Sequence, residues 1–257
     1  MSASPPRLEI RGLTKSFGDL EVLRDLHLHA AQGEFVSILG PSGSGKSTTF
    51  SVLIGATTAD GGEVLVDGRP LAAADHAPFA FMPQKDVLFP WRRIEANLTL
   101  GLEVQGVPRA EARRRVQPLL ERFGLAGFER HYPAQLSGGM RQRAALLRTV
   151  VQEREILLLD EPFGALDALT RTEMQRWLEA MWERDRWTVL LITHDVREAV
   201  FLSDRIYVLS PRPATVVREV EVPLPRPRTL QTLADPRAAR IETELLESLI
   251  GDRAQVA

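Results

Sequence analysis

The chain of 257 residues contains no cysteine, which excludes disulfide bonds and thiolate metal sites. No apolar run approaches the roughly 18 residues needed to cross a bilayer, and the opening residues 1–6 lack a charged segment followed by an apolar core. We therefore expect a protein that is cytosolic or attached to a membrane only through partners. The net charge of −2 argues against a dominant role in binding nucleic acid.

What is present is the composition of a globular protein, with 44% hydrophobic and 26% charged residues. Two continuous apolar runs, Ile156–Leu159 and Val189–Ile192, are typical of strands buried on both faces of a parallel sheet. Between them Met174, Leu178 and Met181 recur at helical spacing. This strand-helix-strand pattern predicts an α/β fold built as one large domain.

Other segments are added to that core. Short β-rich segments near the start predict an antiparallel flap around strand 35–39: Leu8–Leu13, Leu26–Ala30 and Val64–Asp67. A helical insert is expected between about residues 94 and 151, where Pro118 restarts or kinks a helix. Pro223–Pro227 predicts a proline-stiffened linker before an amphipathic helix.

One glycine-rich segment carries chemistry. It fits G-x-x-x-x-G-K-[ST] and follows the expected strand 35–39, and its residues are Gly40, Pro41, Ser42, Gly43, Ser44, Gly45, Lys46, Ser47 and Thr48. Glycines let successive backbone N–H groups face a phosphate, Lys46 reaches the β and γ oxygens, and the Ser47 hydroxyl ligates Mg²⁺. The segment therefore predicts a phosphate-binding loop.

Polar residues end both buried strands. Asp160 follows Ile156–Leu159, at the sheet edge where α/β proteins bind ligands, so we expect it to serve a Mg²⁺ ion. Glu161 comes next and is placed to polarise an attacking water, although a helix N-terminal acid is the alternative. His194 ends the second strand and is expected near a γ-phosphate, unless it is only structural.

The segment Leu136–Arg143 contains Ser-Gly-Gly, where Ser137 is the expected N-cap of a helix with an apolar stripe. It lies between the phosphate-binding loop and Asp160-Glu161. The order of these motifs resembles the ATP-binding-cassette (ABC) ATPase family over nearly the whole chain. Met140 departs from the commonest signature of that family, which has glutamine there.

The resemblance implies a P-loop NTPase of the ABC ATPase fold, with a RecA-like core, an antiparallel β subdomain and a helical subdomain. The ATPase domain would span residues 1–222, with helices at about 85–151, and residues 223–257 would form the linker and C-terminal helix. Gln84 would be the Q-loop residue that meets Mg²⁺ and water, and Asp167 would belong to the D-loop. Phe17 would stack on adenine, with a core aromatic as the alternative.

The family pattern also implies an assembly. The signature residues Ser137, Gly138 and Gly139 would close over the ATP held by a second ATPase subunit, a copy of this chain or a close relative. Strings at 162–171 and 88–92 resemble the importer branch that takes up nitrate, sulfonates, taurine or vitamin precursors. Leu88, Phe89 and Trp91 would dock a membrane partner, or else pack the helical insert.

The expected function is therefore that of an ATPase bound through permease subunits to the cytoplasmic face of the membrane, and linked to a solute-binding protein only indirectly. ATP and Mg²⁺ are its expected cofactors. The sequence leaves two alternatives. One is a non-transport ABC ATPase that acts on nucleic acid or in translation, and the other is an ordinary P-loop kinase or GTPase.

Overall fold

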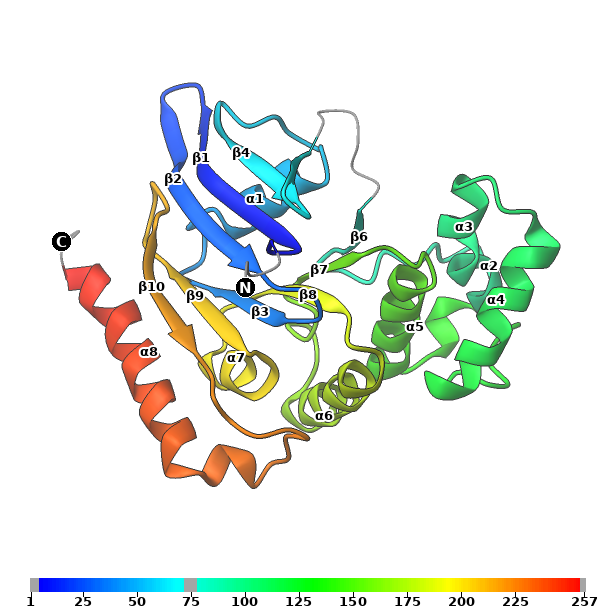
Figure 1. Ribbon diagram of the computed structural model, residues 1–257. Coiled ribbons are helices and arrows are strands. Elements are labelled where there is room, and N and C mark those ends of the chain that lie inside the picture. Colours follow the sequence, from blue (N-terminus) through cyan, green and yellow to red (C-terminus); the bar gives the residue numbers. More distant parts are fainter. Residues whose placement is uncertain (1–4, 72–77, 255–257) are drawn as a thin grey trace.

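A six-stranded sheet forms the centre of the computed structural model, which describes residues 5–71 and 78–254 (Figure 1). Its order is β10-β9-β3-β8-β7-β6, and all neighbours are parallel except β9 and β10. The strands are β3 Phe35–Leu39, β6 Phe79–Met82, β7 Ile156–Asp160, β8 Thr188–Thr193, β9 Arg205–Leu209 and β10 Val216–Glu221. β7 and β8 are buried throughout, which confirms the sequence prediction.

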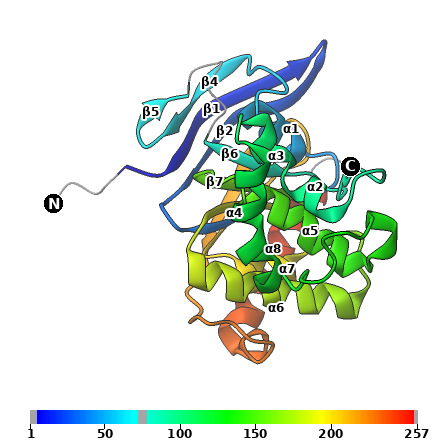
Figure 2. The same ribbon diagram turned by 90° about the vertical axis from the view of Figure 1, so that its right-hand side faces the viewer.

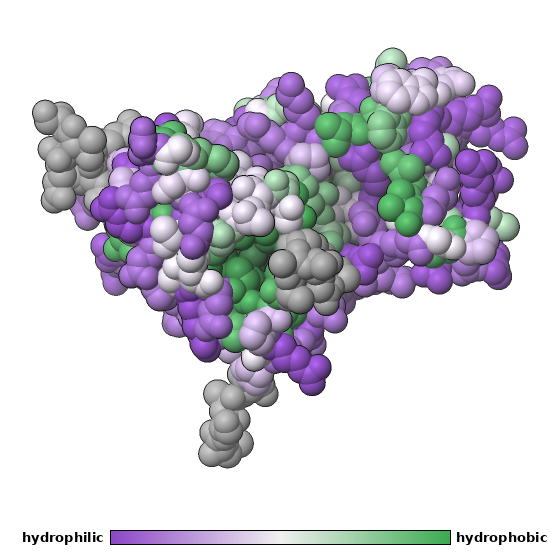
Figure 3. All heavy atoms as spheres, turned by 90° about the horizontal axis from the view of Figure 1, so that it is seen from above, coloured by the Kyte–Doolittle hydropathy of each residue, from purple (hydrophilic) through white to green (hydrophobic). Residues whose placement is uncertain are grey.

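A second, antiparallel sheet of order β2-β1-β4-β5 covers the phosphate-loop side of the core. Its strands are β1 Leu8–Phe17, β2 Leu20–Ala30, β4 Gly61–Val66 and β5 Arg69–Pro70. The antiparallel flap is thus confirmed, but β1 and β2 are longer than predicted. They meet in a tight turn at Gly18, whose φ of 58° favours glycine. Apolar atoms gather in a hollow on this face of the molecule (Figure 3).

Helices flank the central sheet and also project to one side of it (Figures 1 and 2). Around the sheet lie α1 Lys46–Leu53, α6 Ala168–Asp185, α7 Val196–Leu202 and α8 Pro236–Ala254. The projection consists of α2 Ile94–Leu98, α3 Leu100–Val104, α4 Arg109–Arg122 and α5 Gly138–Val150, and short 3₁₀ turns occur at Pro133–Gln135 and Thr232–Ala234. α4 runs through Pro118 without restarting.

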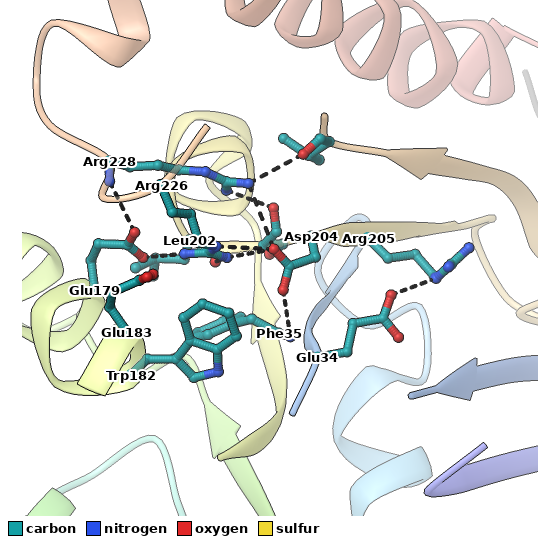
Figure 4. Close-up of polar contacts among 12 residues, drawn as sticks. Glu34, Phe35, Glu179, Trp182, Glu183, Leu202, Asp204, Arg205, Arg226 and Arg228 are labelled. Atoms are coloured by element: carbon teal, nitrogen blue, oxygen red, sulfur yellow. Dashed lines mark hydrogen bonds and ion pairs between the residues drawn. The ribbon is translucent and has the colours of Figure 1, made fainter. Parts of the chain in front are cut away.

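The proline-rich segment after β10 does not run free of the body. Arg226 is held between the carboxylates of Glu179 and Asp204, and its guanidinium lies 3.9 Å from the centroid of the Trp182 ring (Figure 4). Arg228 is buried and donates to backbone carbonyls at the end of α7. The stiffening by proline stays a prediction, but two arginines bind this segment to the core.

No helix within residues 5–71 and 78–254 is long and apolar enough to span a membrane.

Candidate functional site

The loop between β3 and α1 requires glycine at two positions. Gly43 has φ 77° and Gly45 has φ 115°, a region that side-chain-bearing residues avoid. A Cβ on Gly45 would also lie 2.8 Å from Leu23 Cδ2 on β2, so the loop packs directly against the antiparallel sheet. Gly45 gives α1 no side-chain cap. The first backbone N–H groups of α1 therefore remain available to an anion.

Lys46 lies inside this loop and is only 5% exposed, so it is not the exposed lysine that a loop position suggests. Its Nζ donates to the carbonyl oxygens of Gly40 and Pro41, each at 2.8 Å. Burial lowers the pKa of Lys46, while the nearby carboxylates of Glu161 and Asp160 oppose that shift. The chain has thus buried a cation whose only hydrogen-bond partners within the described residues are neutral.

A buried hydroxyl in the same loop also lacks a partner. Ser44 Oγ is buried and forms no hydrogen bond within the described part of the chain. A phosphate oxygen would satisfy both this donor and the Lys46 ammonium. The loop therefore fits a phosphate group on its own geometry.

Asp160 ends β7 beside Ser47. Burial raises the pKa of the Asp160 carboxyl, and a hydrogen bond from the Ser47 side chain works against that rise. Carboxylate and hydroxyl oxygens of this kind suit Mg²⁺, which also takes ligands from phosphates and water. No group of three or more His, Cys, Asp or Glu able to hold a metal occurs in the described ranges. A metal here would therefore depend on the nucleotide for its other ligands.

The structure brings Gln84, Glu161 and His194 together. They follow the neighbouring strands β6, β7 and β8, so the sheet order places them at one edge. Glu161 Oε2 accepts a hydrogen bond from Gln84 Nε2 at 3.0 Å, and His194 Nδ1 lies 3.3 Å from the same oxygen. Glu161 itself has φ 43°, an uncommon conformation for a residue with a side chain and one often found at functional sites.

A cavity of about 570 Å³ lies over the loop. It is lined by loop residues 42–43 and 45–48, by Gln84 and Glu161, and by Phe17, which is 51% exposed at the end of β1. The predicted Phe17 is therefore in the cavity wall. Leu20, Val22 and Arg212 also line it and were missed, because no local motif marks them and Arg212 comes from a distant part of the chain.

The Ser-Gly-Gly segment lies elsewhere. Ser137 caps α5 by accepting from Met140 N at 3.2 Å, which confirms the predicted N-cap. A Cβ on Gly139 would lie 3.0 Å from Thr170 Cγ2 at the start of α6. Asp167 caps α6 by accepting from the backbone N–H groups of Leu169 and Thr170. None of residues 137–139 or 167 lines the cavity over the phosphate loop.

The predicted apolar surface at 88–91 divides into two parts. Leu88 is 6% exposed and packs in the core, as the packing alternative predicted, and its backbone N–H donates to Asp86 Oδ1 at 3.2 Å. Trp91 is 72% exposed and its ring lies 5.3 Å from that of Phe89. Val87, which was not predicted, is 50% exposed. Asn97 fixes the loop by bonding Phe89 N at 2.7 Å and Phe89 O at 3.1 Å.

Known proteins are similar to this chain over most of its length. The family model described as ABC transporter matches residues 23–164, more than half of the sequence. A protein of Pseudomonas fluorescens named as an aliphatic sulfonates import ATP-binding protein is 41% identical over 252 residues, which cover 96% of this chain and 90% of that protein. A formylaminopyrimidine import ATP-binding protein of Halalkalibacterium halodurans is 42% identical over 211 residues, 82% of each chain.

A similar fold occurs among solved structures. One is a dimeric ATP-binding cassette in a post-hydrolysis state bound to ADP and Pi. It superposes with a TM-score of 0.70 at 30% identity, covering 84% of this chain and 98% of that chain.

Proposed function

The chain belongs to the ABC transporter family of ATP-hydrolysing cassettes, and on that premise we propose that it powers the import of a small solute through membrane subunits. Relatives named for import of sulfonates and of a formylaminopyrimidine support a solute of the sulfonate, nitrate, taurine or vitamin-precursor type. The same names speak against the alternative of a cassette acting on nucleic acid or in translation. The chain contributes the ATPase and leaves solute recognition to its partners.

One observation carries the ATPase chemistry: Glu161 Oε2 faces Gln84 Nε2 and His194 Nδ1 at the edge of the cavity that contains Lys46. We infer that the loop N–H groups, Ser44 and Lys46 bind the phosphates. Glu161 accepts a proton from the attacking water, and His194 and Gln84 hold its carboxylate in place. Ser47, Asp160 and Gln84 would hold Mg²⁺, which when bound neutralises charge on the phosphates. Phe17 supplies a flat face for adenine.

The separation of Ser137–Gly139 from that cavity supports a shared site. We propose that the N-terminus of α5 and Asp167 contact the nucleotide held by a second cassette, which is a copy of this chain or a close relative. Two copies then enclose two ATP molecules, because each contributes one phosphate loop and one Ser-Gly-Gly segment. The dimeric state of the solved cassette with ADP and Pi is consistent with this assembly.

The helical projection, placed at about 85–151 within an ATPase domain of residues 1–222, is the proposed contact with the membrane. Trp91 and Val87 are exposed apolar residues of the loop that leads into it, Phe89 beside Trp91 is half-buried, and Leu88 anchors the loop. Large apolar groups on a fixed loop beside Gln84 suit a permease segment that follows nucleotide-driven motion. The chain would then lie at the cytoplasmic face of the membrane, and a solute-binding protein would act only through the permease.

Uptake by cells tests this function. Cells lacking the gene for this chain should lose uptake of a radiolabelled alkanesulfonate, with nitrate and a formylaminopyrimidine tested in parallel. The wild-type gene should restore uptake, whereas a Glu161→Gln gene should not, because the variant keeps the shape of the site and loses its proton acceptor. Unchanged uptake of every solute in the deletion strain would argue against an import function.

A further inference from the structure

Arg212 is a cation at the phosphate loop to which no sequence motif assigns a role. It lies in the turn between β9 and β10, at residues 210–215, far along the chain from Gly40–Thr48. The cavity over the loop is lined by its side chain together with Lys46 and Phe17. The turn therefore contributes a third wall to the proposed nucleotide site, beside the loop itself and the β1–β2 turn.

The backbone of this turn is fixed. Ala214 is fully buried, donates to Val22 O at 2.9 Å and accepts from Arg24 N at 3.0 Å, so the turn extends the edge of β2. Ser210 Oγ accepts from Thr215 N at 3.0 Å and closes the turn from within. Because β2 also packs against Gly45, the turn and the phosphate loop share one support. The Arg212 side chain thus starts from a defined position.

The guanidinium lies against the loop itself. Arg212 Nη2 is 3.3 Å from the point where a Cβ on Gly43 would lie. Any side chain at that position would crowd the guanidinium, and the φ of 77° at Gly43 disfavours one as well. The guanidinium of Arg212 therefore lies beside Gly43 in the middle of the phosphate-binding loop.

Arg212 also lacks an internal partner. No hydrogen bond or ion pair joins it to any of residues 5–71 or 78–254, whereas Arg205, Arg218 and Arg226 nearby each pair with a carboxylate. Guanidinium groups bind phosphate oxygens through two parallel hydrogen bonds, and an unpaired one retains that capacity. The cavity wall thus carries a free cation besides the buried Lys46.

We propose that Arg212 is a nucleotide-binding residue that contacts the phosphate chain of ATP and ADP. This inference rests on the proposed function, since it assigns a further residue to the same site. Lys46 binds the phosphates from within the loop, and Arg212 binds them from the β9–β10 turn. The contact requires phosphates, so the nucleoside alone gains little from it.

Competition binding tests the proposal on the full-length chain. A fluorescent ADP analogue is displaced by ADP, by ATP and by adenosine, with EDTA present so that no metal contributes. Arg212→Ala should weaken ADP and ATP about ten-fold or more and leave adenosine nearly unchanged. Arg212→Lys should recover part of the loss, because it restores the charge without the paired donors. Arg218→Ala is the matched control: it removes a neighbouring arginine of β10 that pairs with Glu244 away from the cavity.

Several outcomes would overturn the inference. One is that Arg212→Ala binds ADP and ATP with wild-type affinity while Lys46→Ala binds neither. That result would overturn the role of Arg212 and leave the proposed function intact. An equal loss of adenosine affinity in Arg212→Ala would also overturn it. So would unchanged nucleotide affinity together with a loss of hydrolysis in the assembled dimer, because that result would assign Arg212 to the contact with the partner. If Lys46→Ala also binds normally, the proposed function itself fails. Thermal melting without nucleotide checks that each variant is folded.

Discussion

At the scale of single residues, the site contains polar groups that are costly to bury and whose missing partners the proposed nucleotide would supply. Lys46 is buried against two carbonyl oxygens, and Ser44 Oγ has no hydrogen-bond partner in the described chain. Glu161 takes a left-handed backbone conformation beside them. Such local penalties are expected where the surroundings are arranged for a ligand rather than for the empty fold.

Glu198 makes a pH-dependent prediction. Burial, followed by the nearby Asp195, raises its pKa to about 8. Between pH 4.5 and about 8, the folded chain keeps the Glu198 proton that the unfolded chain releases. The free energy of unfolding therefore falls as the pH rises through this window. Glu198→Gln stays neutral and should flatten this slope. Urea unfolding at pH 5, 7 and 9 measures it, and parallel profiles for the two proteins would contradict the assignment.

At the scale of elements, the strands were predictable because their chemistry is local. Continuous apolar runs gave β7 and β8, and the residues directly after them are Glu161 and His194. Because the carboxyl ends of neighbouring parallel strands lie at the same edge of a sheet, the sequence was enough to place Glu161 and His194 at one edge. The N-cap role of Ser137 was equally predictable, because an N-cap depends on the few residues that follow it.

Contacts between distant segments could not be predicted. Arg212 meets the phosphate loop only because Ala214 bonds to β2, a pairing with no periodic signal. Leu88 and Trp91 are both large and apolar, yet Leu88 is 6% exposed and Trp91 is 72% exposed, a difference that no local motif marks. The prolines at 223–227 indicated a linker. Its binding to the core depends on contacts of Arg226 and Arg228 with carboxylates and carbonyl oxygens that lie far away in the sequence.

The exposed loop of the helical projection is tested by a pair of variants. Trp91→Asp should weaken co-purification with the permease and leave ATP affinity and the melting temperature unchanged, because the ring is exposed and does not line the cavity over the phosphate loop. Leu88→Asp should instead unfold the loop, lowering stability by at least about 2 kcal/mol. Normal assembly of Trp91→Asp would exclude it from the membrane contact.

The arginine contacts of Figure 4 predict a stability effect on α7. Arg228 Nη1 donates to Val200 O at 3.0 Å and to Ser203 O at 2.6 Å, and Nη2 donates to Val222 O at 3.2 Å. Arg228→Ala would remove these donors from buried residues, although Val222 O keeps its hydrogen bond from Leu224 N at 2.8 Å, and should lower the free energy of unfolding by about 2–4 kcal/mol. Arg237→Ala breaks only the exposed pair with Asp235 and should change it by less than about 1 kcal/mol. Equal effects in denaturant titrations would contradict this difference.

At the scale of the whole molecule, the two groups of residues proposed to contact nucleotide lie on separate surfaces of one chain. The phosphate loop, Phe17 and Glu161 surround one cavity, while Ser137–Gly139 and Asp167 cap α5 and α6 outside it. In the proposed assembly a single copy leaves each surface incomplete, and pairing two copies head to tail would complete both. In this arrangement ATP binding and subunit closure are one event, which is how hydrolysis would move a membrane partner.

The most direct test is ATP-dependent dimer formation by Glu161→Gln. The substitution keeps the size of the side chain and removes the proton acceptor, so turnover should fall on the order of 10²–10⁴-fold while ATP binding survives. With ATP and Mg²⁺, sizing chromatography with light scattering should show this variant shifting from monomer to dimer. Adding Ser137→Arg should abolish the dimer, because the bulky side chain fills the space of the partner's γ-phosphate. A Glu161→Gln chain that stays monomeric at saturating ATP even with its membrane subunits, or that hydrolyses ATP at the wild-type rate, would contradict the shared site.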